Sequence, residues 1–216
     1  MDAQLARMRV DYRRDELDVG DLADTWYEQL ARWLEDATAA GVVEPNAMVL
    51  ATAGDDGTPS SRTVLCKDVD ERGVVFYTNY TSAKSRELRT LRRAAATFPW
   101  LAIQRQVSLR GDVERVAPEE TRAYWVTRPR GSQLGAWASA QSTYVRDRDA
   151  LDTALAATER RFADTDEVPV PPHWGGWRIV PDRIEFWQGR TNRMHDRLCF
   201  EQNPVDRMWR VRRLAP

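Results

Sequence analysis

The sequence has few of the residues that build metal sites and disulfide frameworks. Its 216 residues include two cysteines and two histidines. Cys66 and Cys199 lie far apart, and the N-terminus lacks the apolar core of a secretory signal, so we expect free thiols in a reducing compartment. His173, His195 and these cysteines form no clustered zinc motif, and we expect no metal. The sequence therefore predicts a cytoplasmic protein.

Long apolar runs and an excess of one charge are missing too. No stretch approaches the ~20 apolar residues that a membrane-spanning helix needs. Lys and Arg total 32 and Asp and Glu total 33, which gives a net charge of −1. General nucleic-acid binders usually carry a basic excess. We therefore expect neither a membrane nor a nucleic acid as a partner.

The N-terminal part predicts an arm followed by a helix. Residues 1–18 are polar and charge-rich, and we expect a mobile arm or a short helix there, with residues 19–216 forming a single domain. Asp21 could cap the next helix. Apolar side chains then recur at a period of 3.6 residues from Leu22 to Ala37, and Gly41 supplies a stop.

The rest of the chain predicts a mainly β fold with peripheral helices. Short apolar segments and turn signals indicate an antiparallel meander over 47–52, 61–67 and 74–78. No regular βαβ alternation, Gly-x-Gly-x-x-Gly motif or P-loop appears, which argues against a Rossmann fold and favours a closed or partly closed antiparallel barrel. Further helices are expected at 82–91, from Pro118, at 132–140 and at 148–163, and further strands at 95–103, 105–116, 176–180, 183–188, 196–200 and 208–213.

Several basic residues lie beside the ends of expected strands. Arg62 and Lys67 are five residues apart, so in a regular strand they point to opposite faces and could serve two anionic groups. Lys84 falls in the first turn of the helix that begins near Ser82, where free N–H groups favour phosphate. The competing interpretation is solvated surface charge, because Lys and Arg are mostly exposed.

Two further groups of residues could bind an anionic ligand. Tyr124 and Arg128 are four residues apart, so one helix face can present both, and with Ser132 they would suit a phosphate monoester. An ordinary basic helix end explains them equally well. In an extended segment Arg193 and His195 share one face and could orient an anionic or phenolic ring, although a lone histidine is more often structural.

Several stretches across the chain form an ordered set of motifs. They are Ser61–Lys67, Phe76–Asn79, Arg128–Trp137, Gln141–Ser142, Trp174–Trp177, Glu185–Gly189, Arg193–Arg197 and Arg213–Pro216. Together they resemble one family, the pyridoxamine 5′-phosphate oxidases, and the resemblance runs from about Met8 to the last residue.

The resemblance implies a split β-barrel homodimer that binds FMN at the subunit interface. Such an enzyme oxidises pyridoxamine 5′-phosphate and pyridoxine 5′-phosphate to pyridoxal 5′-phosphate and reduces O2 to H2O2. Arg193 and His195 would lie over the substrate ring as the catalytic pair. Lys67, Tyr124, Arg128 and Ser132 would bind the substrate phosphate, while Arg9 and Tyr12 would close over the site. The implied FMN contacts are Arg62, Thr63, Lys67, Tyr77, Thr78, Lys84, Gln106, Gln141, Ser142, Trp187 and Arg197.

One departure and two alternatives accompany this resemblance. Ala83 stands where many relatives have arginine, which removes one cation from the implied FMN phosphate site. Another flavin or deazaflavin oxidoreductase on the same barrel, such as a phenazine-pathway oxidase, is one alternative. A non-catalytic protein that stores FMN or pyridoxal phosphate is the other. The full substrate-phosphate set, together with Arg193 and His195, favours the oxidase.

Overall fold

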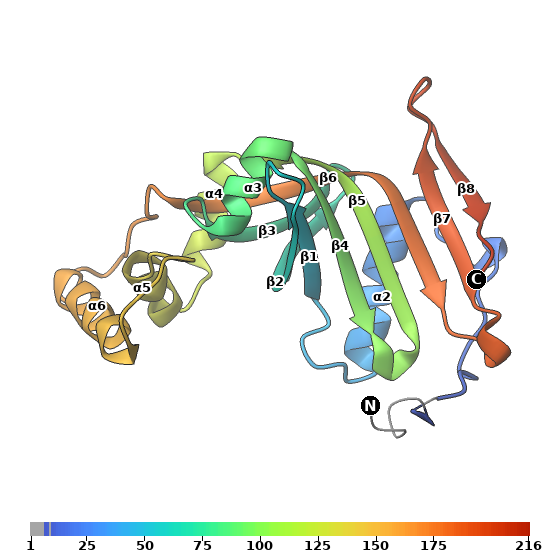
Figure 1. Ribbon diagram of the computed structural model, residues 1–216, viewed down its shortest axis with the longest axis horizontal. Coiled ribbons are helices and arrows are strands. Elements are labelled where there is room, and N and C mark those ends of the chain that lie inside the picture. Colours follow the sequence, from blue (N-terminus) through green and yellow to red (C-terminus); the bar gives the residue numbers. More distant parts are fainter. Residues whose placement is uncertain (1–6, 9) are drawn as a thin grey trace.

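The chain forms a barrel of antiparallel strands, from which a helical pair and a strand pair extend at opposite ends (Figure 1). The computed structural model describes residues 7–8 and 10–216. The strands are β1 (Ala47–Ala53), β2 (Pro59–Asp70), β3 (Gly73–Asn79), β4 (Arg93–Trp100), β5 (Arg105–Arg115), β6 (Trp174–Gln188), β7 (Asp196–Gln202) and β8 (Trp209–Arg213). The helices are α2 (Trp26–Ala39), α3 (Ala83–Leu91), α4 (Pro118–Val126), α5 (Arg130–Ala138) and α6 (Arg148–Arg161), with 3-10 turns at Val19–Asp21, Leu101–Ile103 and Thr191–Arg193.

The barrel closes because β6 is long enough to pair with several neighbours. The strands follow one another in the order β3-β2-β1-β4-β5-β6, and an additional pairing of β3 with β6 closes the ring. Residues 174–179 of β6 pair with β3, whereas residues 183–188 pair with β7. Strands β7 and β8 therefore continue the sheet outside the ring. The predicted mainly β, antiparallel split barrel is confirmed.

The sequence predicted two strands where the structure has the single strand β6. Pro181 interrupts the apolar pattern, but the pairing of β5 with β6 shifts register between Arg110 and Gly111, and this bulge accommodates the proline. An added Cβ at Gly111 would lie 1.9 Å from the Val180 carbonyl oxygen. The close approach of the two strands therefore requires glycine at this position.

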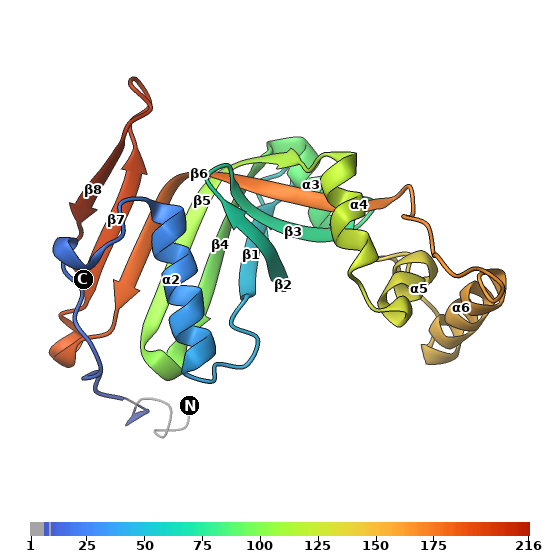
Figure 2. The same ribbon diagram turned by 180° about the vertical axis from the view of Figure 1, so that it is seen from behind.

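Helix α2 lies across one face of the barrel and contributes to its core (Figure 2). The predicted 3.6-residue period is confirmed over the helix itself. The Trp33 ring meets Phe186 of β6 edge to face, with 5.2 Å between ring centroids. The buried side chains of the helix are Trp26, Gln29, Leu30, Trp33 and Ala37.

The predicted start of this helix was wrong, and its predicted end was right. Thr25 caps α2 by accepting a hydrogen bond from the Glu28 N–H. Asp21 instead belongs to the preceding 3-10 turn, where it forms a reciprocal capping box with Asp18. Gly41 follows the helix with a φ of +73°, as the predicted stop requires.

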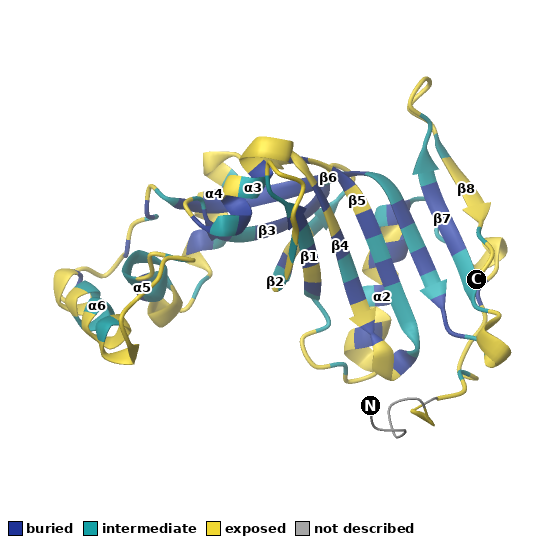
Figure 3. Ribbon diagram, viewed as in Figure 1, coloured by how far each residue is buried: buried dark blue, intermediate teal, exposed yellow. Residues whose placement is uncertain are grey.

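Burial alternates along β4 and β5, as expected for strands with one face on a core (Figure 3).

The sequence predicted a strand that continues to residue 103. In the structure β4 ends at Trp100, because the chain turns there into the 3-10 turn Leu101–Ile103. A second, smaller core lies between α4, α5 and the start of β6, around Trp125 and Trp174. In the described part of the chain, no helix is long and apolar enough to cross a membrane.

Candidate functional site

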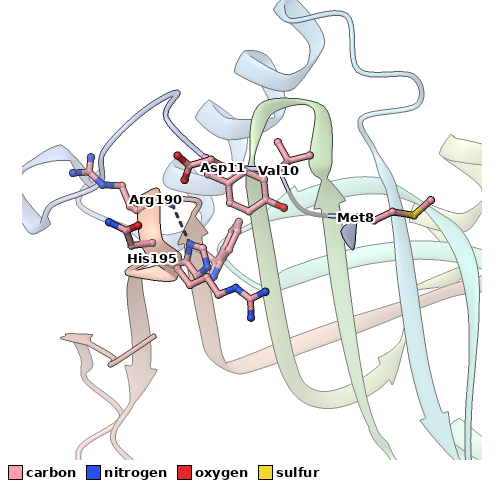
Figure 4. Close-up of a pocket in the computed structure, with 9 residues that line it drawn as sticks. Met8, Val10, Asp11, Arg190 and His195 are labelled. Atoms are coloured by element: carbon pink, nitrogen blue, oxygen red, sulfur yellow. Dashed lines mark hydrogen bonds between the residues drawn. The ribbon is translucent and has the colours of Figure 1, made fainter. Parts of the chain in front are cut away.

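The predicted site residues gather in two separate hollows of the same chain. The first, which we call the basic pocket, has a volume of about 590 Å³. Its lining residues come from β2, β3, α3, α4, α5 and the loops after α4 and α5: Arg62, Thr63, Val64, Leu65, Lys67, Tyr77, Thr78, Lys84, Tyr124, Thr127, Arg128, Pro129, Ser132 and Gln141. The second, the arm pocket, has a volume of about 680 Å³ and is lined by Met8, Val10, Asp11, Tyr12, Trp187, Arg190, Asn192, Arg193 and His195 (Figure 4).

Arg62 and Lys67 line the same pocket, although the sequence predicted that they could serve two separate anionic groups from opposite faces of a regular strand. The β2–β3 register shifts between Cys66 and Asp68, so Lys67 is the extra residue of a bulge. A bulge redirects a side chain that would otherwise alternate with its neighbours. The chain thereby brings two cations five residues apart to one hollow.

Lys84 lies where the sequence predicted it, in the first turn of α3 behind the Ser82 cap. It is buried, and its Nζ donates to Thr78 Oγ1 at 3.3 Å and to Gln141 Oε1 at 3.2 Å. Burial, followed by the nearby Arg62 charge, lowers the pKa of Lys84. A negative group beside Arg62 and Lys84 would favour the charged form of Lys84 and so oppose this lowering of its pKa.

A stack of three aromatic rings lies at the basic pocket, and two of them, Tyr77 and Tyr124, line it. Tyr77 lies 4.1 Å from Tyr124 and 5.3 Å from Trp174 between ring centroids, and the rings are nearly parallel. Lys67 Nζ lies 6.0 Å from the centroid of Tyr124, and the Arg128 guanidinium lies 4.8 Å from that of Trp174. The stack therefore carries one cation at each end.

Arg128 lies beyond α4 rather than on it, because that helix ends at Val126. The prediction that one helix face presents Tyr124 and Arg128 was wrong, although both residues line the basic pocket. One terminal nitrogen of Arg128 donates to the Ser132 carbonyl oxygen at 2.9 Å. Its Nε is buried and donates to nothing in the described chain. An acceptor at this nitrogen would remove the cost of an unmade hydrogen bond.

In the arm pocket, His195 is held by the backbone that precedes it (Figure 4). The Arg190 N–H donates to His195 Nδ1 at 3.1 Å. The imidazole also packs against Trp187, with 4.6 Å between ring centroids, and against Tyr12 at 5.9 Å. Burial, then the charges of Arg193 and Arg197, lower the pKa of His195. The neutral ring is therefore favoured, with its proton on Nε2.

Arg193 and His195 line one pocket, but not because they share a face of an extended segment. Thr191–Arg193 forms a 3-10 turn, and Asn192 and Arg193 both have positive φ, at 55° and 62°. The left-handed region is unfavourable for residues other than glycine and is often found at functional sites. The tight turn, rather than strand alternation, directs both side chains into the arm pocket.

The N-terminal arm closes this pocket through Tyr12. Its ring lies edge to face with Trp187, at 5.8 Å between centroids. Gly189 makes the approach possible, because a Cβ there would lie 2.7 Å from the Tyr12 ring. Four residues after Tyr12, Glu16 forms an ion pair with Arg190 at 2.6 Å, which attaches the C-terminal part of the arm to the same pocket. Arg9, which the sequence also predicted here, lies outside the described residues.

Three predicted residues, Gln106, Arg197 and Ser142, line neither pocket. Gln106 of β5 and Arg197 of β7 are the strand partners of Trp187 of β6, which lines the arm pocket. Arg197 is ion-paired with Glu185 at 2.8 Å. Ser142 follows Gln141 with a φ of 70° and is exposed.

Sequence reasoning missed residues that act through the predicted ones. Trp174 supports Arg128 and Tyr77 from within a quoted motif, but only the fold shows that stack. Arg190 orients His195 through a backbone N–H, which leaves no signal in a sequence.

Cys66 and Cys199 are free, as predicted, and burial raises the pKa of Cys66 to about 12. The described residues contain no cluster of metal-ligating side chains.

Comparisons with known proteins give a consistent result. A family model described as pyridoxamine 5′-phosphate oxidase matches residues 34–162, and one described as the pyridoxine 5′-phosphate oxidase C-terminal dimerisation region matches residues 174–216. The pyridoxine/pyridoxamine 5′-phosphate oxidase of Saccharopolyspora erythraea is 64% identical over 215 residues, which is 99% of this chain and 96% of that protein.

Two solved structures resemble this chain in fold. PhzG from Burkholderia lata, in complex with tetrahydrophenazine-1-carboxylic acid, has a TM-score of 0.85 and 34% identity, and the match covers 94% of this chain and 98% of that one. A pyridoxamine 5′-phosphate oxidase-related, FMN-binding protein from Nostoc punctiforme has a TM-score of 0.72 and 17% identity, covering 91% of this chain and 99% of that one, and it supports the fold alone.

Proposed function

The chain belongs to the pyridoxamine 5′-phosphate oxidase family and is one of its enzymes, and we propose that it oxidises pyridoxamine 5′-phosphate and pyridoxine 5′-phosphate to pyridoxal 5′-phosphate. In this proposal FMN is the cofactor, and O2 is the final electron acceptor and is reduced to H2O2. The observation that carries the proposal is the basic pocket. Its described lining contains four cations and no carboxylate: Arg62, Lys67, Lys84 and Arg128.

The residues of the basic pocket fit two phosphate groups. Lys84 lies in the first turn of α3, where the free backbone N–H groups of a helix also favour an anion, and Arg62 of β2 lies near it. Lys67 and Arg128 contact opposite ends of the aromatic stack, and the unpaired Nε of Arg128 can donate to a phosphate oxygen. The first pair would hold the phosphate of FMN, and the second would hold that of the substrate with Tyr124 and Ser132.

Other FMN contacts would come from Thr63, Tyr77, Thr78, Gln106, Gln141, Ser142, Trp187 and Arg197. When bound, FMN supplies the hydride acceptor for oxidation at C4′ of the substrate. The protein's contribution is position, because hydride transfer needs its reacting atoms ~3–3.5 Å apart.

Arg193 and His195 would act on the substrate ring. The guanidinium of Arg193 stabilises negative charge on the ring substituents, and neutral His195 donates from Nε2. Tyr12, closed over Gly189, and Arg9 would exclude water.

Because the two pockets are separate hollows of one chain, we propose that the working enzyme is a homodimer. The basic pocket of one protomer and the arm pocket of its partner would together form each active site. The match of residues 174–216 to a dimerisation region supports this, because these residues include Trp187, Arg193, His195 and Arg197.

A complementation experiment tests the shared site. Arg128→Ala should raise KM and Arg193→Ala should lower kcat, so with substrate kept well below the wild-type KM each homodimer should be nearly inactive. After the two variants are unfolded, mixed and refolded, half of the dimers combine one chain of each kind, and one of their two sites is intact. We expect recovery of about a quarter of the wild-type activity. If both pockets of a site came from one chain, no activity would return.

The direct test of the function is aerobic turnover of FMN-loaded protein. Pyridoxal 5′-phosphate and H2O2 should form in equal amounts from pyridoxamine 5′-phosphate. Absence of product from either phosphorylated substrate, with FMN bound, would contradict the proposal. Activity on a carboxylated tricyclic compound instead would favour the phenazine-type alternative that the similarity to PhzG raises.

A further inference from the structure

One carboxylate contacts the basic pocket from behind its lining. Glu87 lies on α3, one turn after Lys84, and its Oε2 is 3.2 Å from a terminal nitrogen of Arg62. Both side chains are mostly buried, with exposed fractions of 20% for Glu87 and 23% for Arg62. The ion pair is therefore better protected from solvent and salt than a pair on the open surface.

Glu87 and Arg62 share two hydroxyl partners in addition to their direct contact. Ser60 Oγ donates to Glu87 at 2.8 Å and accepts, at 2.5 Å, from the same terminal nitrogen of Arg62 that contacts Glu87. Thr52 also bonds to both residues. The terminal nitrogens of Arg62 thus already have acceptors when no phosphate is present.

The electrostatics of this cluster indicate why the carboxylate is there. Arg62 lies near the buried Lys84, and two cations in one hollow repel each other. Although burial alone would raise it, hydrogen bonds from Thr52 and Ser60 and the charge of Arg62 hold the pKa of Glu87 below its usual value. Glu87 is therefore ionised near neutral pH and compensates one of the two positive charges.

We propose that Glu87 is the internal counter-ion of the FMN-phosphate site: it holds Arg62 in place when the site is empty, and it lowers the affinity for FMN by competing with the phosphate for the same guanidinium. The inference rests on the proposed FMN site. Glu87 acts through Arg62 and is a positioning residue, not a catalytic one.

The charge balance gives the direction of the effect. A phosphate monoester carries about −1.5 to −2 charges at neutral pH. Arg62 and Lys84 offer two positive charges, and Glu87 cancels one, while Ala83 at the first position of α3 adds none. Removing the negative charge of Glu87 should therefore strengthen the binding of the phosphate and lower the stability of the protein without FMN.

The experiment compares FMN with riboflavin, which has the same ring system and no phosphate. Apoprotein is titrated with each flavin, and binding is followed by quenching of flavin fluorescence. The variants are Glu87→Gln, which removes the charge and keeps the shape, and Glu71→Gln, which makes the same change of net charge in the exposed β2–β3 turn.

We expect Glu87→Gln to lower the Kd for FMN by about threefold to tenfold and to leave the Kd for riboflavin unchanged. The gain should shrink at high salt, and the melting temperature of the apoprotein should fall. Glu71→Gln should change none of these values. The salt and riboflavin readouts separate a charge effect from a general structural effect.

Three results would overturn the inference. Weaker FMN binding by Glu87→Gln would mean that Glu87 only orients Arg62 for the phosphate. Unchanged FMN binding, or an equal gain for riboflavin, would remove Glu87 from the recognition of the phosphate. If Glu87→Gln fails to fold, Glu87→Asp, which keeps the charge, must bind FMN no more tightly than wild type. Failure of the wild-type protein to bind FMN at all would instead overturn the proposed function.

Discussion

The backbone N–H of Arg190 donates a 3.1 Å hydrogen bond to Nδ1 of His195. This contact determines which imidazole nitrogen carries the proton, because a nitrogen that accepts a hydrogen bond cannot also be an N–H group. Nε2 is left as the donor. Protonation of His195 would place two N–H donors against each other, so the fold favours the neutral ring.

The first prediction concerns the pH dependence that His195 imposes. Burial and the charges of Arg193 and Arg197 lower its pKa from the ordinary 6.5, so the neutral form is favoured in the folded protein and its stabilisation is lost as pH falls through the lowered pKa. We expect kcat/KM to show no titration of His195 above pH 6.5 and to fall at lower pH. His195→Asn, measured over the same range, should be slower and lack this limb. A limb centred above pH 6.5 in the wild-type protein would contradict the prediction.

Arg193 should matter for turnover and not for the cofactor. It lines the arm pocket, whereas most of the proposed FMN contacts line the basic pocket. We expect Arg193→Ala to lower kcat by about 10²-fold or more, as for loss of one charge-stabilising donor. FMN content, measured from flavin absorbance, should stay near the wild-type value. Unchanged turnover would remove Arg193 from the mechanism.

Arg128 should act mainly on substrate binding. It carries a buried Nε without a partner, stacks on Trp174 and lies at the proposed site of the substrate phosphate. Loss of a charge-assisted contact costs about 1.5–3 kcal/mol, so we expect KM to rise by about tenfold to a hundredfold in Arg128→Ala. Arg122→Ala, on the exposed side of α4, is the matched control and should leave KM unchanged. Release of FMN from Arg128→Ala would show that the two phosphate sites have been assigned wrongly.

Gly111 should be essential for the stability of the barrel. Its Cβ would lie 1.9 Å from the Val180 carbonyl oxygen, and the backbone on both sides belongs to paired strands that cannot move independently. We expect Gly111→Ala to lower the free energy of unfolding by about 2–4 kcal/mol, measured by urea titration of the apoprotein. Gly20→Ala is the control, because an added Cβ there meets nothing within 4 Å. Equal stability of the two variants would show that β5 and β6 can separate without cost.

Local patterns predicted much of the fold. The 3.6-residue period of α2, the Ser82 cap of α3 and the turn signals of the meander depend on residues close together in the chain. Predictions failed where distant contacts decide the structure. The strand β6 continues through Pro181 because Gly111 of another strand allows a bulge. Asp21 is a residue type that suits a helix cap as Thr25 does, but in the structure Asp21 bonds to Asp18 in the preceding 3-10 turn, and Thr25 caps α2.

The sequence by itself determined which residues are available for chemistry, because their motifs and their resemblance to one family are properties of the chain order. Only the tertiary structure decided their geometry. The bulge at Lys67 interrupts the strand alternation between this residue and Arg62, and the turn at Arg193 brings it into the same pocket as His195. The packing of α3 against β2 also places Glu87 beside Arg62. These arrangements depend on backbone hydrogen bonds and packing between segments far apart in sequence, and periodicity or residue type does not encode them.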